Sequence, residues 1–158
     1  MSQKLKEIHK EGYANIIFSS TPIEYGKEDK NSIKNIFKKP EPIYARCYFP
    51  NSIGKVGERN FWHEIWIDGN FVKRTLYKDP PDPEWDQIQI WVSDEDYKNE
   101  LLNLESGEHD IIIWVMKCEF EGKFFKTETT LSGDLLVKEK ERADLTRLSK
   151  GNISYIVP

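Results

Sequence analysis

The chain has 158 residues, of which 13% are aromatic and 32% are charged, and its formal net charge at pH 7 is -4. This length suits one domain with a single substantial core, and aromatic side chains suit pleated, half-buried sheets. The acidic balance argues against a nucleic-acid partner, because phosphate binding normally shows as a basic excess. No run approaches the ~20 apolar residues of a membrane helix, so we expect no membrane partner.

The first residues carry lysines but lack the apolar segment of a signal peptide. We therefore expect a cytoplasmic protein, although a mature secreted form placed behind an added methionine would look the same. Residues 1–13 are expected to be a tail or a short charged helix, and residues 14–158 a single β-sandwich domain. Residues 14–20 predict the first strand, in which Ile16 and Phe18 alternate.

Residues 21–41 are polar and rich in turn formers, and we interpret them as a long loop with one helical turn at 33–37. Prolines bound the second predicted strand, 42–50, which is typical of edge positions. Alternation along this strand places Cys47 on its inner side.

Residues 60–78 predict a hairpin around Asp68-Gly69, a dipeptide that favours a type I′ turn. Its register predicts three cross-strand pairs, namely Trp66–Phe71, Ile65–Val72 and Glu64–Lys73. His63 then lies opposite Arg74, which indicates a position at the surface or the sheet edge. The two faces differ, with Phe61, Ile65 and Ile67 on one and Trp62 and Trp66 on the other. We expect this hairpin to be covered on both sides or to present its aromatic face to a partner.

The proline-rich segment 79–84 predicts a crossover between sheets, and residues 85–93 predict a strand that directs Ile88, Ile90 and Val92 inward. The opposite face carries a strip of alternating indole and amide side chains: Trp85, Gln87, Gln89 and Trp91. Residues 94–106, with Ser93 as N-cap, place Tyr97, Leu101 and Leu104 at helical spacing. We expect a short helix across one end of the sandwich.

Residues 107–136 contain two β-prone runs around Gly122-Lys123, which predict a hairpin with a type II′ turn. This register predicts three pairs, Phe120–Phe125, Glu119–Lys126 and Lys117–Glu128. It places one apolar set inward, namely Ile112, Trp114, Met116, Cys118 and Phe120, joined by Phe125 and Leu131. Residues 131–138 predict a last strand or the end of this hairpin. Residues 138–150 predict a charged amphipathic helix with Ala143, Leu145 and Leu148, ended by Gly151, and 152–158 a short terminal strand.

Cys47 and Cys118 both face inward in these registers, so they could form an intersheet disulfide. We favour two buried reduced thiols, because the sequence contains no sign of an oxidising compartment.

The segment 101–115, LLNLESGEHDIIIWV, resembles the approach to the late strand of immunoglobulin-like sandwiches. There, a leucine, a turn glycine and a corner aromatic precede an alternating strand, and His109 stands where a tyrosine is usual. Cys47, Trp62 and Cys118 follow the order Cys–Trp–Cys of that family, although Cys118 lies further past the corner than usual. The resemblance implies an Ig-like fold and carries no activity with it.

The strip formed by Trp85, Gln87, Gln89 and Trp91 is the first candidate binding site. Neighbouring side chains on one strand face lie about 7 Å apart, which separates the two indoles by roughly 20 Å. Indoles stack on sugar rings and amides pair with hydroxyls, so a glycan is a possible ligand. The opposing interpretation is that the terminal helix or the 21–41 loop covers this face. Trp62 and Trp66 form a second aromatic group that could join the contact.

No residue pattern predicts catalysis, a cofactor or a metal site. We therefore predict an all-β protein, an antiparallel β-sandwich of Ig-like architecture with one or two short peripheral helices. Its predicted function is that of a non-catalytic binding module for a protein or carbohydrate. Two alternatives stay open: a small hydrolase with a pocket at one end of the sandwich, and a homo-oligomer whose aromatic face is the subunit interface.

Overall fold

The computed structural model describes residues 16–49, 61–77, 82–121, 127–129, 135–137 and 142–158. For 117–121, 127–129, 135–137 and 142–146 it describes the backbone alone. The predicted tail at 1–13 and the turn at Gly122-Lys123 lie outside the described residues. The helices of the described part are too short and too polar to span a membrane.

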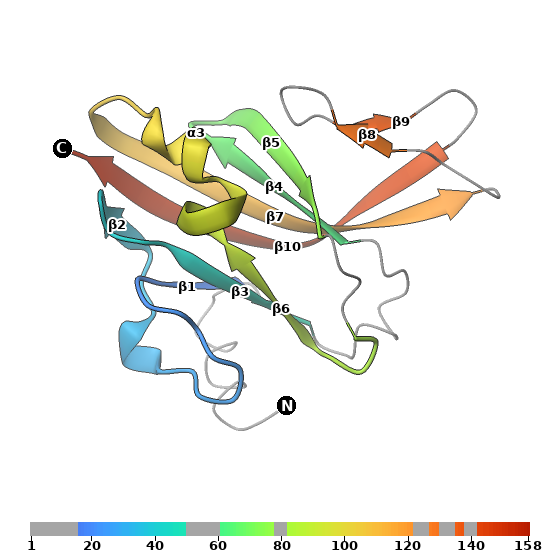
Figure 1. Cartoon of the computed structure of the whole chain (residues 1–158), viewed down its shortest axis with the longest axis horizontal. Coiled ribbons are helices and arrows are strands. Elements are labelled where there is room, and N and C mark those ends of the chain that lie inside the picture. Colours follow the sequence, from blue (N-terminus) through green and yellow to red (C-terminus); the bar gives the residue numbers. More distant parts are fainter. Residues whose placement is uncertain (1–15, 50–60, 78–81, 122–126, 130–134, 138–141) are drawn as a thin grey trace.

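Two mostly antiparallel sheets make up most of the chain that the structure describes, which confirms the predicted all-β sandwich (Figure 1). The smaller sheet has the strand order β1 (Ile16–Ser19), β3 (Tyr44–Tyr48), β6 (Gln87–Trp91). The larger sheet has the order β2 (Ile36–Lys38), β10 (Arg142–Val157), β7 (Gly107–Glu121), β4 (Phe61–Ile67), β5 (Asn70–Leu76). In this sheet β2 runs parallel to β10, and the other neighbours are antiparallel. A separate pair is formed by β8 (Thr127–Thr129) and β9 (Leu135–Val137).

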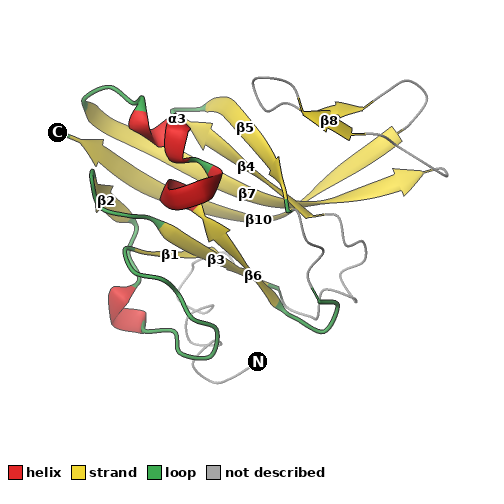
Figure 2. Ribbon diagram, viewed as in Figure 1, coloured by secondary structure: helices red, strands yellow, loops and turns green. Residues whose placement is uncertain are grey.

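The helical segments are short and peripheral, as expected (Figure 2). They are a 3₁₀ turn, η1 (Lys30–Ser32), a π turn, η2 (Val92–Asp96), and one α-helix, α3 (Lys98–Leu102). Tyr97 and Leu101 are buried in the core at 0% and 3% exposure, as their spacing predicts. Ser93 is not the N-cap: its hydroxyl oxygen accepts a hydrogen bond from the Ile43 amide at 2.7 Å, which ties the segment to β3.

The sheets pack closely where β1 faces β10. Gly151 on β10 lies under the ring of Phe18, and a Cβ there would come within 2.5 Å of the phenyl carbon Cζ. A glycine is required here because any side chain would overlap the ring. The prediction that Gly151 ends a helix is therefore wrong.

The predicted helix at 138–150 is wrong, because residues 142–157 form the long strand β10 along β7. A β-bulge lies between Arg147 and Ser149, and Leu148 is the extra residue. An inserted residue breaks the period of two and brings apolar positions to a spacing of three, which imitates a helix. The predicted terminal strand forms the end of β10.

The inner face of β7 is the reverse of the predicted one. Ile111, Ile113 and Val115 are fully buried in the core. Ile112 and Trp114 are half-buried on the outer face, where Met116 is also buried. Positions 111–116 are apolar without interruption, so alternation cannot choose a face there, and the prediction depended on charges further along the strand. The side chains of Cys118 and Phe120 lie outside the description.

The partner of the second half of β7 also differs from the prediction. Lys117 pairs with Thr146 of β10 and with Phe61 of β4, whereas Glu128 pairs with Leu136 in the β8–β9 pair. The predicted Lys117–Glu128 pair is therefore wrong. Glu119 pairs with Asp144, and its predicted partner, like that of Phe120, lies outside the described residues.

The β4–β5 hairpin confirms its predicted turn, with Asp68 at φ 51° and Gly69 at φ 80°. Trp66 pairs with Phe71 as expected, but a bulge then shifts the register by one residue. The observed pairs beyond it are Ile65–Lys73, Glu64–Arg74 and His63–Thr75. The predicted pairs Ile65–Val72, Glu64–Lys73 and His63–Arg74 are wrong because Val72 is the extra residue and packs against the core.

The predicted helical turn at 33–37 is also wrong. The observed turn lies earlier, at η1, where Asp29 caps it through the amide of Asn31 at 3.0 Å. Residues 36–38 instead form β2, and Phe37 is fully buried in the core. Phe37 therefore belongs to a strand that extends the large sheet beside β10.

Candidate functional site

The strip on β6 is only partly open. Trp85 is 49% exposed and Trp91 is half-buried, but Gln87 is buried at 7% exposure. The buried Arg46 of β3 donates hydrogen bonds to the amide oxygens of Gln87 and Gln89, the latter at 3.0 Å. The strip therefore has two indoles that are at least partly accessible. The amide oxygens of the two glutamines between them already accept hydrogen bonds from Arg46.

Arg46 also joins the strip to the loop between β1 and β2. Its Nε and Nη2 donate to the carbonyl oxygen of Ile23 at 2.9 and 2.6 Å. Next to it, the buried Glu28 accepts from the Tyr48 hydroxyl at 2.9 Å. The loop thus covers the middle of this face, as one of the two opposing interpretations of the strip expects.

A second surface lies on the outer face of the five-stranded sheet, which we call the cation–aromatic face. It consists of Glu64, Trp66, Phe71, Arg74, Trp114, Arg147 and Lys150. Strand pairing sets it in order, because Glu64 lies between Arg74 of β5 and Trp114 of β7, and Trp114 pairs in turn with Lys150 of β10. The four residues form one row across four strands.

Glu64 is the centre of this face, and it is fully buried although it points away from the sandwich core. Its Oε2 accepts from Nε and Nη2 of Arg74 at 3.1 and 2.9 Å. Its Oε1 accepts from Arg147 Nη2 at 3.2 Å and from the Trp66 indole nitrogen at 2.9 Å. Each carboxylate oxygen therefore has two donors, which offsets the cost of burying the charge.

Aromatic rings and cations alternate around Glu64. The Arg147 guanidinium carbon lies 4.5 Å from the centroid of the Trp114 ring and 5.8 Å from that of Trp66. Lys150 Nζ lies 5.5 Å from the same Trp114 ring. Phe71 meets Trp66 edge-on at 5.7 Å between centroids. These contacts hold cations against ring faces, which is favourable because the ring quadrupole is negative there.

The predicted tryptophans therefore separate into different environments. Trp62 is 3% exposed and its indole nitrogen has no described partner, whereas Trp66 is half-buried beside Arg147. Trp91 ends β6 of the other sheet and Trp85 precedes that strand by two residues, so the structure does not bring the two groups together. Trp114 and Arg147 were not predicted as part of a site, because alternation directs Trp114 inward and the apolar spacing around Arg147 is that of a helix.

His63 is buried at 2% exposure rather than at the surface, which corrects the prediction. Its Nδ1 hydrogen-bonds the hydroxyl of the buried Tyr97, and its Nε2 lies 3.7 Å from Asp96 Oδ2. Burial and the nearby Lys73 ammonium lower the pKa of His63 to about 3. This neutral imidazole joins β4 to the helical segment.

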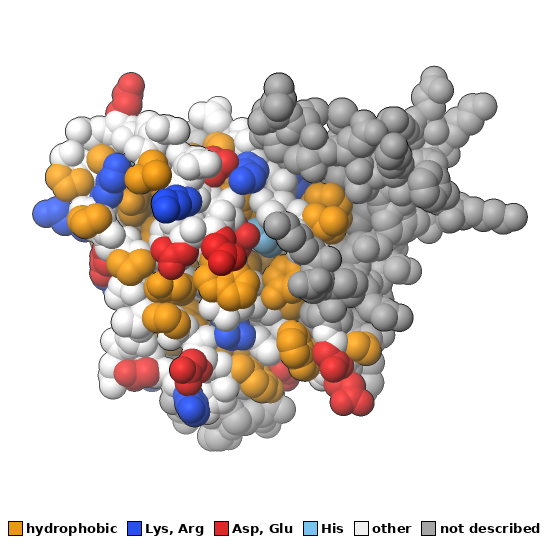
Figure 3. Space-filling view, in the orientation of Figure 1, with side chains coloured by type: hydrophobic (Ala, Val, Ile, Leu, Met, Phe, Trp, Pro, Cys, Tyr) orange, Lys and Arg blue, Asp and Glu red, His pale blue; other side chains and the backbone are white. Residues whose placement is uncertain are grey.

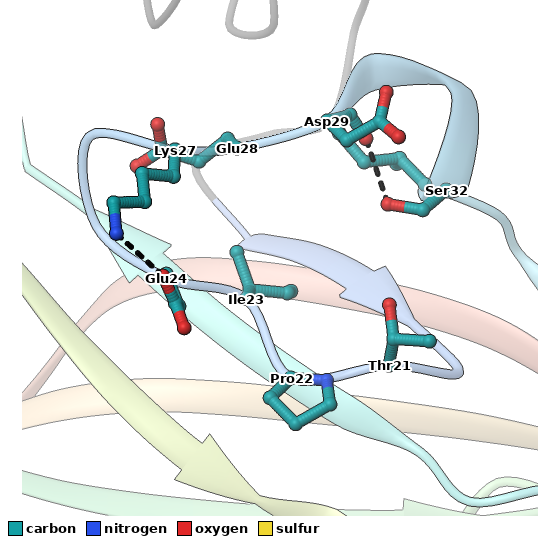
Figure 4. Close-up of a pocket in the computed structure, with 9 residues that line it drawn as sticks. Thr21, Pro22, Ile23, Glu24, Lys27, Glu28, Asp29 and Ser32 are labelled. Carbon is teal, nitrogen blue, oxygen red and sulfur yellow. Dashed lines mark hydrogen bonds and ion pairs between the residues drawn. The ribbon is translucent and has the colours of Figure 1, made fainter.

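One cavity of about 120 Å³ lies in the β1–β2 loop (Figure 4). Three of its lining residues are acids, and each holds the loop together. Glu24 pairs with Lys27 at 3.4 Å, Asp29 caps η1, and Glu28 accepts from the Gly26 amide at 2.8 Å. A second cavity of about 140 Å³ lies beside α3, next to Leu102 and Tyr155. His63 lines neither of these two cavities.

Figure 3 shows acidic, basic and hydrophobic side chains interspersed on the side of the molecule that carries α3. Within the part of the chain that the structure describes, three or more His, Cys, Asp or Glu side chains do not gather where they could hold a metal ion.

Cys47 is a free thiol with no exposed surface, in line with the expectation of a buried reduced cysteine. Burial raises its pKa to about 12. The side chain of Cys118 lies outside the description.

No family model, no curated protein and no solved structure matches the chain.

Proposed function

We propose that the chain is a non-catalytic binding module of Ig-like architecture that contacts a partner protein through the cation–aromatic face. The observation that carries this proposal is the buried Glu64 on an outward face, with two arginines and Trp66 as its donors. Burying such an ion cluster costs desolvation energy, and apolar packing would stabilise the fold about as well. The cluster is therefore better explained by a role in holding the surrounding side chains ready for a contact.

Strand order supports the Ig-like part of the proposal. Immunoglobulin sandwiches place strands A, B, E and D in one sheet and G, F and C in the other, to which variable domains add C′; the described strands offer a counterpart for each of these except D. The order β1-β3-β6 opposite β10-β7-β4-β5 corresponds to these two sets. At the entry to β7, His109 Nε2 lies 2.7 Å from the carbonyl oxygen of Glu105, four residues upstream. This contact takes the place of the corner hydrogen bond that a tyrosine makes in that family.

The cysteines depart from the antibody pattern. Cys47 lies on β3 and Cys118 on β7, which correspond to the strands that carry the intersheet disulfide in antibody domains. Cys47 is a free thiol, so the proposal is limited to the architecture. The cytoplasmic location remains a prediction.

The composition of the cation–aromatic face supports a protein partner. Tryptophan and arginine are enriched at the centres of protein interfaces, and they dominate the energy when well packed. Trp66 and Trp114 are half-buried, and contacts with Arg147 hold both rings in place. Such ordered side chains lose little conformational entropy when a partner binds.

The β6 strip is the weaker candidate. A glycan platform needs amides free to pair with hydroxyls, but the oxygens of Gln87 and Gln89 already accept from Arg46. Trp85 and Trp91 remain the alternative contact. The hydrolase alternative gains little from the loop cavity, since each of its three carboxylates holds the loop through one oxygen, although Glu28 Oε2 is buried without a described partner.

An array of peptides and glycans, probed with matched variants, tests the proposal. Trp114→Ala should lose binding to the peptides that the wild-type chain selects. Trp85→Ala combined with Trp91→Ala should bind them unchanged. Thermal melts of both variants control for unfolding. Selection of glycans alone, with binding lost only in the Trp85/Trp91 variant, would overturn the proposal in favour of the strip.

A further inference from the structure

The two arginines of the cation–aromatic face differ in how much of their hydrogen-bonding capacity is used. Arg74 forms two bonds to one oxygen of Glu64, and its side chain is 21% exposed. Arg147 forms a single bond of 3.2 Å to the other oxygen, and its side chain is 49% exposed. Because a guanidinium has five N–H donors, Arg147 retains donors for a further acceptor.

Lys150 adds a second accessible cation beside Arg147. Lys150 is exposed, and its Nζ lies 5.5 Å from the centroid of the Trp114 ring. The guanidinium carbon of Arg147 lies 4.5 Å from the same centroid. The Lys150 ammonium is not ion-paired to any of the described carboxylates. Two cations thus border one indole, and both are open to solvent.

The charge of this face is opposite in sign to that of the chain. Among the described residues of this face, three carry a positive charge, namely Arg74, Arg147 and Lys150, and one carries a negative charge, Glu64. The whole chain, in contrast, has a net charge of -4. Along β7 the nearest described acid on the same side is Asp110, four residues and therefore about 13 Å from Trp114. Among the residues whose side chains the structure describes, the excess positive charge is therefore local to the surroundings of Trp114.

The geometry points to an acidic protein segment as the partner, with its carboxylates bound by Arg147 and Lys150 and its backbone packed on Trp114 and Trp66. This inference rests on the proposed function and adds the chemistry of the partner. A guanidinium pairs readily with carboxylates, and complementary charge selects partners. A second copy docked by the same face would bring cations onto cations, which disfavours that occupant.

A blocked hexaglutamate peptide is the probe, and a blocked hexaglutamine peptide is its control. NMR of the indole N–H groups follows the titration, with signals assigned by single tryptophan substitutions. Hexaglutamate should shift the signals of Trp66 and Trp114 but not that of Trp85, and hexaglutamine should shift none of them. The shifts should diminish as salt rises, because exposed charges are screened.

Matched variants locate the charges that matter. Arg147→Gln with Lys150→Gln should weaken hexaglutamate binding by about tenfold, as expected for two accessible ion pairs. Lys150→Gln alone, which leaves the bonds of Glu64 intact, should weaken it by about threefold. The control removes the same charge elsewhere through Lys27→Gln with Lys98→Gln, both exposed, and it should bind like the wild type.

Several results would overturn the inference. Equal signal shifts with hexaglutamine would mean that this face binds peptides without a preference for acidic ones, which would refute the acidic partner. Unchanged affinity in the Arg147/Lys150 variant would refute the role of these cations. Shifts caused by heparin or phosphatidylserine vesicles, but not by hexaglutamate, would assign the cations to a different anion. A different result would contradict the proposed function itself, namely that the Trp114→Ala variant binds the array ligands as well as the wild type does.

Discussion

Replacing Glu64 by glutamine tests whether this carboxylate organises the outer face of the large sheet. The side chain keeps its size but loses its charge and one acceptor oxygen, so at least one arginine faces an amide N–H₂ group. Four donors converge on the carboxylate in the native protein, from Arg74, Arg147 and Trp66.

The expected cost follows from these bonds. Hydrogen bonds to charged groups contribute roughly 1.5–3 kcal/mol each, and breaking a fully buried ion pair costs about 3–5 kcal/mol. Both arginines are partly exposed, at 21% and 49% of their side chains, so water compensates part of the loss. We expect the free energy of unfolding to fall by about 3 kcal/mol.

Urea unfolding followed by circular dichroism measures this change, with the slope m held constant between variants. The matched control is Glu100→Gln, whose carboxylate pairs with Lys73 at 3.4 Å near the surface. It should cost less than about 1 kcal/mol. A loss for Glu64→Gln no larger than that of the control would show that this carboxylate does not organise the outer face.

Three further predictions concern the core. Gly151→Ala should lower the free energy of unfolding by roughly 1–3 kcal/mol in urea titrations, since its Cβ would overlap the ring of Phe18; an unchanged midpoint would mean that the sheets are further apart. Cys47 should react with a thiol reagent only after denaturation, because it is buried and its pKa is raised to about 12; rapid labelling of the folded chain at this position would contradict its burial. Stability should fall as pH drops from about 6.5 towards 3, because the unfolded chain protonates His63 first; this slope should flatten in His63→Gln, and an equal slope in both would assign it to other groups.

The structural features that depend only on neighbouring residues were predicted correctly from the sequence. Asp68-Gly69 favours its own turn, and the alternation of Ile88 and Ile90 places one face of β6 inward, both as observed. These features need only local rules of turn geometry and period-two burial. The class of fold follows from many such strands together.

The errors arose where local rules have no unique answer. In β10 the extra residue Leu148 breaks the strand period. In β7 the positions 111–116 are apolar on both faces, so only the neighbouring layers decide which side enters the core. Contacts between distant segments were also beyond reach, as when Arg147 meets Glu64 across 83 positions and Arg46 meets Gln87 across 41.

The candidate site was therefore predicted only in part. The aromatic residue types and the separation of Trp66 from Ile65 onto opposite faces were visible in the sequence. The cations were not, because pairing along β10 brings Arg147 and Lys150 beside Trp114.

Fluorine NMR of the chain with 5-fluorotryptophan at all five tryptophans identifies which aromatic surface binds a partner. Each signal is assigned by substitution, and the tightest ligand from the arrays is added. We expect the signals of Trp66 and Trp114 to shift while those of Trp85 and Trp91 stay in place. Shifts confined to Trp85 and Trp91 would contradict this expectation and move the binding surface to the smaller sheet.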